Sequence, residues 1–480
     1  MVGQRILAGC RAVLLVALAL NPVSAGQPGA GDLGDAEAIQ GKPNFVVIFC
    51  DDLGYGDLAC FGHPTIQTPH LDQMAAEGMK LTQFYSASSV CTPSRAALLT
   101  GRLPIRSGMC STKRRVLFPD SAGGIPASEV TLAEALKAQG YATSAVGKWH
   151  LGHLPQYLPT NNGFDSYFGI PYSNDMDKLA TAPKYREANF KPKSEYFNVP
   201  LMKDLEIIER PADQTTITRR YTQEAVERIK ANKEQPFFVY LAHSMPHVPL
   251  FASDEFAGTS LRGTYGDVIE EIDWSVGQIL QTLRDEGLDN NTLVFFTSDN
   301  GPWLIFNEIG GSAGLLREGK GSTWEGGQRE PTIAWWPGHI PAGKTNPGMG
   351  STMDIYATCI SLAGGDVPSD RVVDGLDLTG MLCRGEESPR ESMFYYRGTE
   401  LFAVRKGAFK AHFITQTAYL GESPVKHDPP ILNNLEVDPS ERFDVAKDHP
   451  DELAAIEALV AEHRAKLKAP PSQLERRIQK

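Results

Sequence analysis

The sequence predicts an α/β protein in which a large, mostly parallel sheet is sandwiched by helices and followed by a smaller domain with an antiparallel sheet and a helix. Short apolar segments rich in β-branched residues alternate with amphipathic segments of helical length over most of the chain. The strand segments are continuously apolar, which is typical of parallel strands covered on both faces. After Gly385 short strands follow one another closely, which indicates an antiparallel sheet.

The elements of the large sheet are expected in a regular order. Residues 44–50 (NFVVIFC) form a continuous apolar run and predict a buried strand. Gly101 and Gly140 follow two of the helical segments, where glycine commonly ends a helix. The other strands are expected at 141–146, 236–241, 292–297 and 332–336, and the helices at 71–78, 93–100, 130–139, 214–232 and 265–286.

Two domains follow from this pattern, one over residues 43–385 and a smaller α+β domain over 386–480. The second is expected to contain adjacent short strands and a final helix. These lie at 392–396, 401–405 and 409–414 for the strands and 450–467 for the helix.

Residues 1–25 predict a signal peptide. Arg5 and Arg11 precede a short apolar core at 12–20, and small residues at 23–25 resemble a cleavage site. The core is too short to span a bilayer, so no membrane span is expected. Residues 26–42 are polar and Gly-rich and predict a flexible leader. We therefore expect a secreted or periplasmic protein, or a lysosomal one if the source is an animal.

Composition narrows the possible partners. The chain of 480 residues carries a formal net charge of −12, whereas a nucleic-acid partner favours a basic face, so no nucleic-acid partner is expected. An anionic small substrate remains compatible, because local Lys, Arg and His residues set the field of a site. The seven cysteines do not indicate a dense disulfide framework.

Acidic residues directly follow two of the predicted strands. Asp51 and Asp52 follow the first strand, and Asp299 and Asn300 follow the strand at 292–297. Ligands of open α/β sheets bind beyond the carboxyl ends of the strands, so these side chains are expected at one edge. Carboxylate and amide oxygens are the ligands that Ca²⁺ prefers. The alternative for one pair alone is that aspartate at a strand end only forms a turn.

The segment 91–95 (CTPSR) is the sharpest local motif. Pro93 suits the first turn of a helix, which places Cys91 at the helix N-terminus, where backbone N–H groups favour an anion. Arg95 lies one turn later and can face the same point. The alternative is a small buried cysteine before an ordinary helix.

With the sequence that follows it, this motif resembles the signature of the type I sulfatases. The other motifs of that family stand in order along the chain. They are 51–57 (DDLGYGD), 91–102 (CTPSRAALLTGR), 147–152 (GKWHLG), 246–249 (PHVP), 297–301 (TSDNG), 319–321 (GKG) and 324–331 (WEGGQREP). The resemblance implies an alkaline-phosphatase-like architecture and a sulfatase domain over 43–385.

The resemblance also implies a cofactor, a modification and a reaction. A formylglycine-generating enzyme would oxidise Cys91 to formylglycine (3-oxoalanine). The hydrated aldehyde would attack sulfur and pass through a covalent sulfo-enzyme intermediate, releasing the alcohol of a sulfated sugar, such as a glycosaminoglycan or another sulfated glycan, or of an aryl sulfate. Calcium would be held by Asp51, Asp52, Asp299, Asn300 and modified Cys91.

The remaining roles follow from the matching positions. Arg95 would stabilise the hydrate, and His150 would assist elimination of sulfate. His247 would act as general acid near the leaving oxygen. The implied substrate contacts are Lys148, Lys320, His247 and Ser173, with the lysines holding sulfate oxygens.

Several alternatives stay open at this stage. Lys148 and Lys320 are alternatively solvated charges, and His150 a satisfied core histidine. In the loop 109–120, Lys113, Arg114 and Arg115 either meet an anionic substrate or are merely exposed. Two other functions compete: a phosphatase or phosphodiesterase of the same architecture, which would use Ser or Thr and usually two zinc ions, and a non-catalytic binder of sulfated glycans.

Overall fold

The computed structural model describes residues 1, 41–419 and 421–479. The predicted signal peptide and nearly all of the predicted leader fall on residues 2–40, outside the described residues. Among the helices that are described, none combines the length and apolar character needed to cross a membrane. The fold below concerns the unit that spans Ala36–Lys480.

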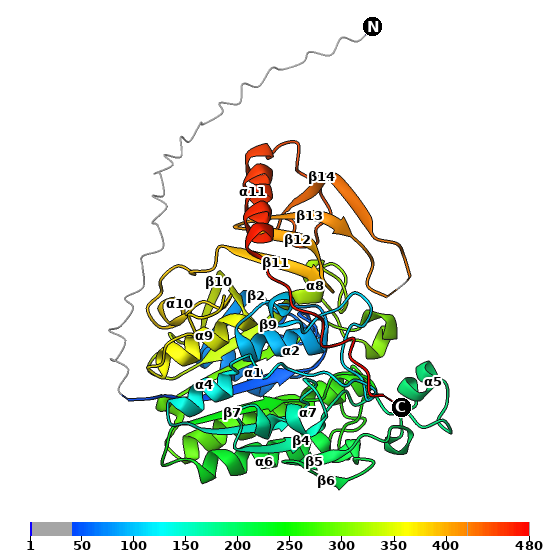
Figure 1. The fold of residues 1–480 in the computed structure, drawn as a ribbon, viewed down its shortest axis with the longest axis vertical. Coiled ribbons are helices and arrows are strands. Elements are labelled where there is room, and N and C mark those ends of the chain that lie inside the picture. Colours follow the sequence, from blue (N-terminus) through cyan, green and yellow to red (C-terminus); the bar gives the residue numbers. More distant parts are fainter. Residues whose placement is uncertain (2–40, 420, 480) are drawn as a thin grey trace. The chain divides into compact units, whose positions relative to one another are not determined.

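A ten-stranded sheet forms the centre of this unit, in the order β10-β2-β9-β8-β1-β7-β3-β4-β5-β6 (Figure 1). Its central strands β8, β1, β7, β3 and β4 are all parallel, which confirms the predicted mostly parallel sheet. The strands are β1 (Asn44–Cys50), β2 (Met79–Tyr85), β3 (Ala142–Gly147), β4 (Ser166–Gly169), β5 (Leu201–Lys203), β6 (Glu206–Glu209), β7 (Phe237–Ala242), β8 (Thr292–Ser298), β9 (Arg329–Trp335) and β10 (Lys344–Ser351).

The sheet is mixed towards both ends. Strand β9 lies antiparallel to both β8 and β2, although its sequence resembles that of the parallel strands. A strand inside the sheet is buried whether its neighbours run parallel or antiparallel to it, as β9 is. The apolar run in its sequence therefore does not reveal its direction.

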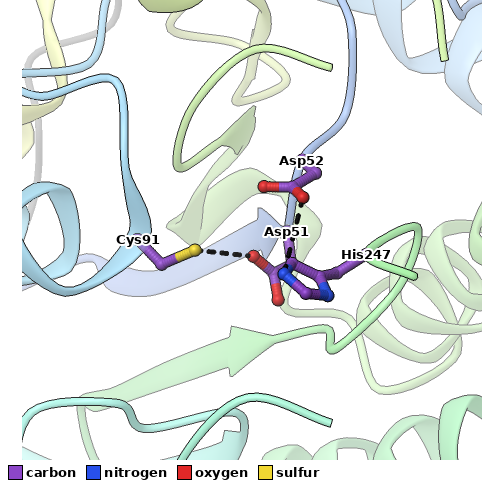
Figure 2. Close-up of side chains that lie close together, drawn as sticks. All are labelled: Asp51, Asp52, Cys91 and His247. Carbon is purple, nitrogen blue, oxygen red and sulfur yellow. Dashed lines mark hydrogen bonds and ion pairs between the residues drawn. The ribbon is translucent and has the colours of Figure 1, made fainter. Parts of the chain in front are cut away.

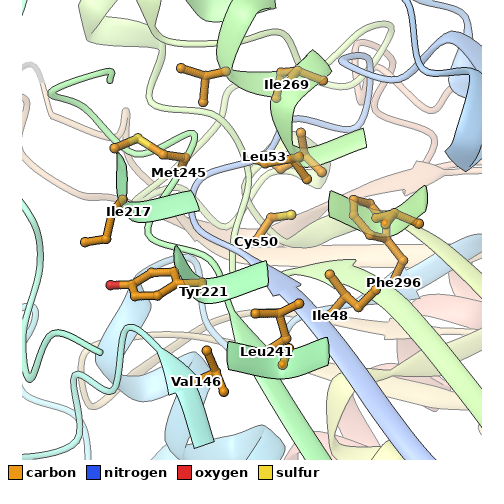
Figure 3. Close-up of a cluster of buried hydrophobic side chains, with 14 of the residues drawn as sticks. Ile48, Cys50, Leu53, Val146, Ile217, Tyr221, Leu241, Met245, Ile269 and Phe296 are labelled. Carbon is orange, nitrogen blue, oxygen red and sulfur yellow. The ribbon is translucent and has the colours of Figure 1, made fainter. Parts of the chain in front are cut away.

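Both faces of the sheet are covered by helices. Along β1, Val46 and Ile48 belong to one apolar cluster, which contains residues of the helices α1 (Pro69–Glu77), α6 (Ile217–Ala231) and α7 (Thr264–Asp285). Phe45 and Val47 belong to the other cluster, with residues of α2 (Cys91–Thr100), α4 (Leu132–Ala138) and α9 (Thr352–Leu362). Figure 3 shows part of the first cluster, where Ile48 lies near Leu241 and Phe296. Because side chains alternate across a strand, two covered faces require the continuous apolar runs seen in the sequence.

The five helices predicted along the large sheet, α1, α2, α4, α6 and α7, lie within a few residues of their expected positions. Helix α2 begins at Cys91 itself rather than at residue 93, and α6 begins at Ile217 after a short 3-10 turn. We call the part of the chain that is built on the ten-stranded sheet the large unit. Its helices are α1 (Pro69–Glu77), α2 (Cys91–Thr100), α3 (Pro104–Ser107), α4 (Leu132–Ala138), α5 (Tyr185–Phe190), α6 (Ile217–Ala231), α7 (Thr264–Asp285), α8 (Glu325–Gln328), α9 (Thr352–Leu362) and α10 (Thr379–Cys383). Of these, α3, α5, α8, α9 and α10 were not predicted.

A four-stranded antiparallel sheet follows, as predicted, and α11 (Pro450–Lys466) packs on it (Figure 1). Its strands are β11 (Ser392–Arg397), β12 (Glu400–Lys406), β13 (Phe409–Thr415) and β14 (Val425–Asn434). Strand β14 was not predicted. It is an edge strand with two prolines and several exposed polar residues, so it lacks the apolar signal of its neighbours.

Buried charges join the small sheet to the large unit. Lys410 Nζ on β13 lies 3.0 Å from Glu325 Oε1 on α8 and 2.9 Å from Glu441 Oε1, and all three side chains are fully buried. His412 Nε2 lies 2.8 Å from the same oxygen of Glu441. Since buried charges must be paired, this cluster links the small sheet to the segment that carries α8.

The segment after α11 returns to the large unit (Figure 1). The Gln473 N–H donates to the carbonyl oxygen of Gly108 at 2.8 Å, and Leu474 is buried in the apolar cluster on the α2 face of the sheet. The cysteines within the described residues are all free, so none of them forms a disulfide.

Candidate active site

Four neighbouring parallel strands end at one edge of the sheet, and polar residues follow each of them. In the order β8, β1, β7 and β3, these residues are Asp299 and Asn300, then Asp51 and Asp52, then the loop that carries His247, then Lys148 and His150. The Asp299 N–H donates to the carbonyl oxygen of Cys50 at 3.0 Å, which continues the pairing of β1 and β8 to the acidic residues. The parallel order of the strands therefore brings these residues together.

The acidic pairs contact one another directly. Asp52 N–H donates to Asp299 Oδ1 at 3.2 Å, and Asn300 Nδ2 donates to Asp52 Oδ1 at 2.6 Å. All four of Asp51, Asp52, Asp299 and Asn300 are buried. The amide oxygen Oδ1 of Asn300 is buried and has no partner among the described residues.

Cys91 faces this acidic group from the first turn of α2. Its Sγ atom lies 3.4 Å from Asp51 Oδ1 and 3.3 Å from Lys320 Nζ. Figure 2 shows Cys91 and His247 approaching the end of β1 from two different elements. Burial raises the pKa of the Cys91 thiol well above its usual range, although Lys148 and Lys320 oppose this.

Arg95, one turn along α2, ties the helix to the sheet edge. Its Nε atom donates to Asp299 Oδ2 at 2.9 Å, and its Nη1 atom donates to the carbonyl oxygen of Lys148 at 3.0 Å. Nη2 lies 3.5 Å from Asp51 Oδ1. The guanidinium is fully buried and stacks 5.4 Å from the centre of the Phe49 ring. Arg95 therefore fixes α2 relative to two of the acidic residues.

Two buried lysines neutralise the carboxylates. Lys320 Nζ lies 2.6 Å and 2.8 Å from the two carboxylate oxygens of Asp52, and Lys148 Nζ forms an ion pair with Asp51. The alternative that Lys148 and Lys320 are solvated surface charges is wrong, because the two side chains are almost completely shielded from water.

The charges shift the carboxyl groups in different directions. Burial alone would raise the pKa of Asp51, but Lys148 and the neighbouring cations hold it well below its usual range. Burial raises the pKa of Asp52 to about 7 despite Lys320. The pKa of Asp299 is also raised by burial, against the effect of Arg95. Asp51 is therefore the carboxyl group that most strongly favours the ionised form. A cation bound nearby would lower the raised pKa values of Asp52 and Asp299.

His150 has a defined tautomer. Its Nε2 atom is 2.9 Å from the carbonyl oxygen of Leu117, which requires Nε2 to carry the proton. The other ring nitrogen, Nδ1, is buried, has no hydrogen-bond partner among the residues that the structure describes, and is an acceptor. Burial lowers the pKa of His150 well below its usual range, and Lys148 lowers it further. The ring is therefore a neutral imidazole with one free lone pair.

His247 and Ser173 line the opposite side of the site. His247 Nδ1 contacts the carbonyl oxygen of Val248, so Nε2 faces the site, 3.6 Å from Asp52 Oδ2 and 3.4 Å from Ser173 Oγ. Ser173 Oγ also lies 3.2 Å from Lys148 Nζ. Burial, followed by Lys320, lowers the pKa of His247 well below its usual range. His243 instead bonds Ser275, 3.3 Å away.

All the residues proposed from the sequence thus converge, but Trp303 was missed. Its ring centre lies 4.5 Å from Lys320 Nζ and 5.2 Å from the centre of the His247 ring. The one sequence feature that could have indicated a site residue here is its position, three residues after Asn300. Nothing in its immediate sequence distinguishes it from a core tryptophan.

The donors fit a hard divalent cation. Ligand atoms of Asp51, Asp52, Cys91 and His247 lie within 4.8 Å of one another. The unpartnered Oδ1 of Asn300 adds an oxygen beside them. Three carboxylates with an amide oxygen suit Ca²⁺, and the buried cations Lys148 and Lys320 show that the carboxylates need positive charge nearby.

Comparisons with known proteins agree with this geometry. The family described as sulfatase matches residues 43–365, and the family described as the C-terminal region of aryl-sulfatase matches 388–480. N-acetylgalactosamine-6-sulfatase of Mus musculus is 43% identical over 96% of this chain and 92% of its own length. Arylsulfatase A of Homo sapiens is 42% identical over 88% of each chain.

A solved structure is similar as well. A sulfatase from Pseudoalteromonas superposes with a TM-score of 0.78 at 30% sequence identity, covering 89% of this chain and 92% of that one. Family, sequence relatives and structure agree over both sheets. The chain belongs to the sulfatase family and is an enzyme that hydrolyses sulfate esters.

Proposed function

We propose that the enzyme is a calcium-dependent sulfatase whose nucleophile is formylglycine made from Cys91, and that it acts on sulfated sugars or aryl sulfates. One observation carries the proposal. The Sγ atom of Cys91 lies between Asp51 Oδ1 at 3.4 Å and Lys320 Nζ at 3.3 Å, at the start of a helix. This point lies beside both the candidate metal ligands and a cation able to hold sulfate.

The oxygen donors would hold calcium, with Cys91 in its modified form completing the set. Asp51, Asp52, Asp299 and Asn300 supply them, and the free Oδ1 of Asn300 supports this assignment. When present, the ion and the aldehyde hydrate would supply a Lewis acid and a nucleophilic hydroxyl. Arg95 would hold the hydrate and α2 in place through its contacts with Asp299 and Asp51.

Lys148 and Lys320 would hold the sulfate oxygens of the substrate, as their buried ammonium groups already face the carboxylates. Ser173 would assist them through its contact with Lys148. His247 would act as general acid towards the leaving oxygen, because a sugar alkoxide is a poor leaving group. Since Nδ1 holds the proton of the neutral ring against the Val248 carbonyl oxygen, Nε2 would first have to take up a proton, which a bound sulfate anion nearby would favour, before it passed that proton on. His150 would accept a proton at Nδ1, the ring nitrogen without a partner.

Three further elements belong to the proposal. Residues 43–385 would form the catalytic domain and 386–480 a smaller domain. A formylglycine-generating enzyme would be the partner that modifies the chain. The protein would be secreted or periplasmic, or lysosomal in an animal, consistent with the apolar segment near its N-terminus.

Mass spectrometry of protein from its native host tests the modification. Trypsin releases the peptide 81–95, in which residue 91 should carry an aldehyde in place of the thiol. The same preparation should hydrolyse 4-nitrophenyl sulfate, and chelation should abolish the activity. A peptide that contains only unmodified cysteine in an active preparation would contradict the mechanism. Equal turnover of 4-nitrophenyl phosphate with zinc bound would instead favour the phosphatase alternative.

A further inference from the structure

Three consecutive basic residues in the loop 109–120 have different partners in the structure. Lys113 pairs with Glu475 at 3.0 Å, and Arg114 pairs with Asp120 at 2.7 Å. Arg115 forms no ion pair with any described carboxylate. Its Nη2 atom instead donates to the carbonyl oxygen of Ala418 at 3.1 Å. Arg115 thus keeps an uncompensated positive charge.

A second arginine without a carboxylate partner meets Arg115. Arg397 at the end of β11 donates from Nη2 to the same carbonyl oxygen of Ala418 at 2.7 Å, and from Nη1 to that of Thr417 at 3.1 Å. Burial, together with Arg115, lowers the pKa of Arg397 to about 10. Glu318 and Glu400 lie nearby, but neither forms an ion pair with these arginines within the described residues. Two guanidinium groups thus converge on one oxygen with donors left over.

This arginine pair adjoins the active site. Gly321 follows Lys320, and a Cβ atom added at Gly321 would lie 3.1 Å from Arg115 Nη1 and 2.7 Å from the Tyr419 ring. The Gly321 N–H donates to the carbonyl oxygen of Ser89, two residues before Cys91, at 2.8 Å. Arg115 and Arg397 line a cavity of about 230 Å³ together with residues of the segment 87–90. The guanidinium group of Arg115 therefore lies beside Gly321, the residue that follows Lys320 in the sequence.

A second hollow, of about 600 Å³, has Tyr419 in its lining. It is lined by the aromatic rings of Trp303 and Tyr419 and by the charged side chains of Arg186, Glu318 and Lys320, among others. Aromatic rings beside a few polar groups suit a sugar ring. The Trp303 and Tyr419 rings lie 5.5 Å apart. A sugar ring held there would have Lys320 beside it to meet its sulfate ester. Ala418, which also lines this hollow, carries the carbonyl oxygen that Arg115 and Arg397 both contact, so the arginine pair lies next to the hollow.

We propose that Arg115 and Arg397 form a subsite for a second anionic group, a sulfate or a carboxylate, on the sugar next to the one whose sulfate ester is hydrolysed. The inference rests on the proposed function and narrows its substrate class to glycans with more than one negative charge. A guanidinium pair suits both anions, because each guanidinium can donate two parallel hydrogen bonds to them. A monoanionic aryl sulfate would leave the subsite empty.

The test compares R115Q and R397Q with K113Q. Lys113 lies in the same loop as Arg115 and is already paired, so its loss removes the same charge without touching the subsite. For each variant of the fully modified enzyme, the rate of 4-nitrophenyl sulfate hydrolysis is measured in the presence of a competitive inhibitor, which gives an inhibition constant. The three inhibitors are a monosulfated hexosamine–uronate disaccharide, its uronate methyl ester, and the same ester with a second sulfate. Thermal melting checks that each variant is folded.

For R115Q and R397Q we expect the inhibition constant of at least one doubly anionic disaccharide to rise about 10-fold or more. The values for K113Q and for turnover of 4-nitrophenyl sulfate should stay within about 2-fold of wild type. Loss of affinity confined to the free uronate identifies a carboxylate subsite, and loss confined to the disulfated ester identifies a sulfate subsite. Equal effects in all three variants, or no dependence on the second charge, overturn the subsite.

Failure of the proposed function gives a different result. A wild-type enzyme that does not hydrolyse 4-nitrophenyl sulfate contradicts the sulfatase mechanism, whereas the subsite is then tested by calorimetric binding of the same disaccharides. If R397Q unfolds, R115Q alone decides, because Arg115 is exposed and its loss leaves no buried group unpaired.

Discussion

The Nζ atom of Lys320 lies 3.3 Å from the Sγ atom of Cys91, although 229 positions separate the two residues. The same ammonium group contacts both oxygens of Asp52. Lys320 therefore links the proposed nucleophile to a candidate calcium ligand. Its removal should lower both the activity and the free energy of unfolding, and the two effects can be measured separately.

Replacement of Lys320 by Ala should lower kcat/KM for a sulfate ester about 10²- to 10³-fold, as the loss of one electrostatic contact to the transition state does. It should also cost about 3 kcal/mol of stability in calcium-free protein, because Asp52 is left buried without its partner. Calcium should restore part of that stability. Denaturant unfolding with and without calcium measures this, and a cost independent of calcium would contradict the shared role of Asp52.

Replacement of Asn300 by Leu should weaken calcium binding at least about 10-fold, because it removes the unpartnered buried Oδ1 beside the carboxylates. Isothermal titration calorimetry on chelator-treated protein measures the affinity. Asn291→Leu on the exposed turn before β8 is the matched control and should bind calcium as the wild type does. Unchanged affinity in Asn300→Leu would exclude this amide as a ligand.

Replacement of Cys91 by Ala should abolish hydrolysis of sulfate esters, because no other described residue offers a nucleophile at this point, while calcium binding through the four oxygen donors should persist. Activity assays and calorimetry on one preparation test both. Residual turnover near the wild-type rate would remove Cys91 from the mechanism, and complete loss of calcium would show that residue 91 carries most of the binding.

Replacement of Lys410 by Met should lower the free energy of unfolding by about 3 to 5 kcal/mol, since buried Glu325 and Glu441 would lose the cation that they share, and Arg329 pairs with Glu325 alone, at 3.6 Å. Lys406→Met, an exposed change in the same sheet, should change it by less than about 0.5 kcal/mol. Urea denaturation compares the two. Similar stabilities would mean that the cluster reorganises at little cost.

Acidification should destabilise the packing of α11 through His463. The ring bonds Tyr396 at 2.7 Å and stacks on Phe394, and burial, followed by Arg106, lowers its pKa to about 4. The unfolded chain binds this proton first as pH falls from about 6.5, so stability is lost between about pH 6.5 and 4. His463→Gln should show a shallower fall in melting temperature over this window. An identical slope would assign the acid sensitivity elsewhere.

Much of the molecule could be predicted from local patterns. The continuous apolar run at 44–50 identified a strand covered on both faces, and the acidic residues after it and after β8 identified the edge where a site forms. The cysteine at a helix start was recognisable for a similar reason. In each case the signal lies within a few neighbouring residues, where side-chain periodicity and backbone geometry act.

Other features were decided only by contacts between distant segments. The direction of β9 and the presence of β14 depend on which neighbours pair with them. Lys113, Arg114 and Arg115 are consecutive and chemically alike, yet within the described part of the chain Lys113 and Arg114 pair with carboxylates, whereas Arg115 instead meets Arg397 from the small sheet. The sequence by itself determined the family, the strands with continuous apolar runs such as β1 and β8, and the site residues that stand in recognisable motifs. Tertiary structure alone decided which charges are neutralised and which stay available, because that depends on distances between segments that local sequence does not encode.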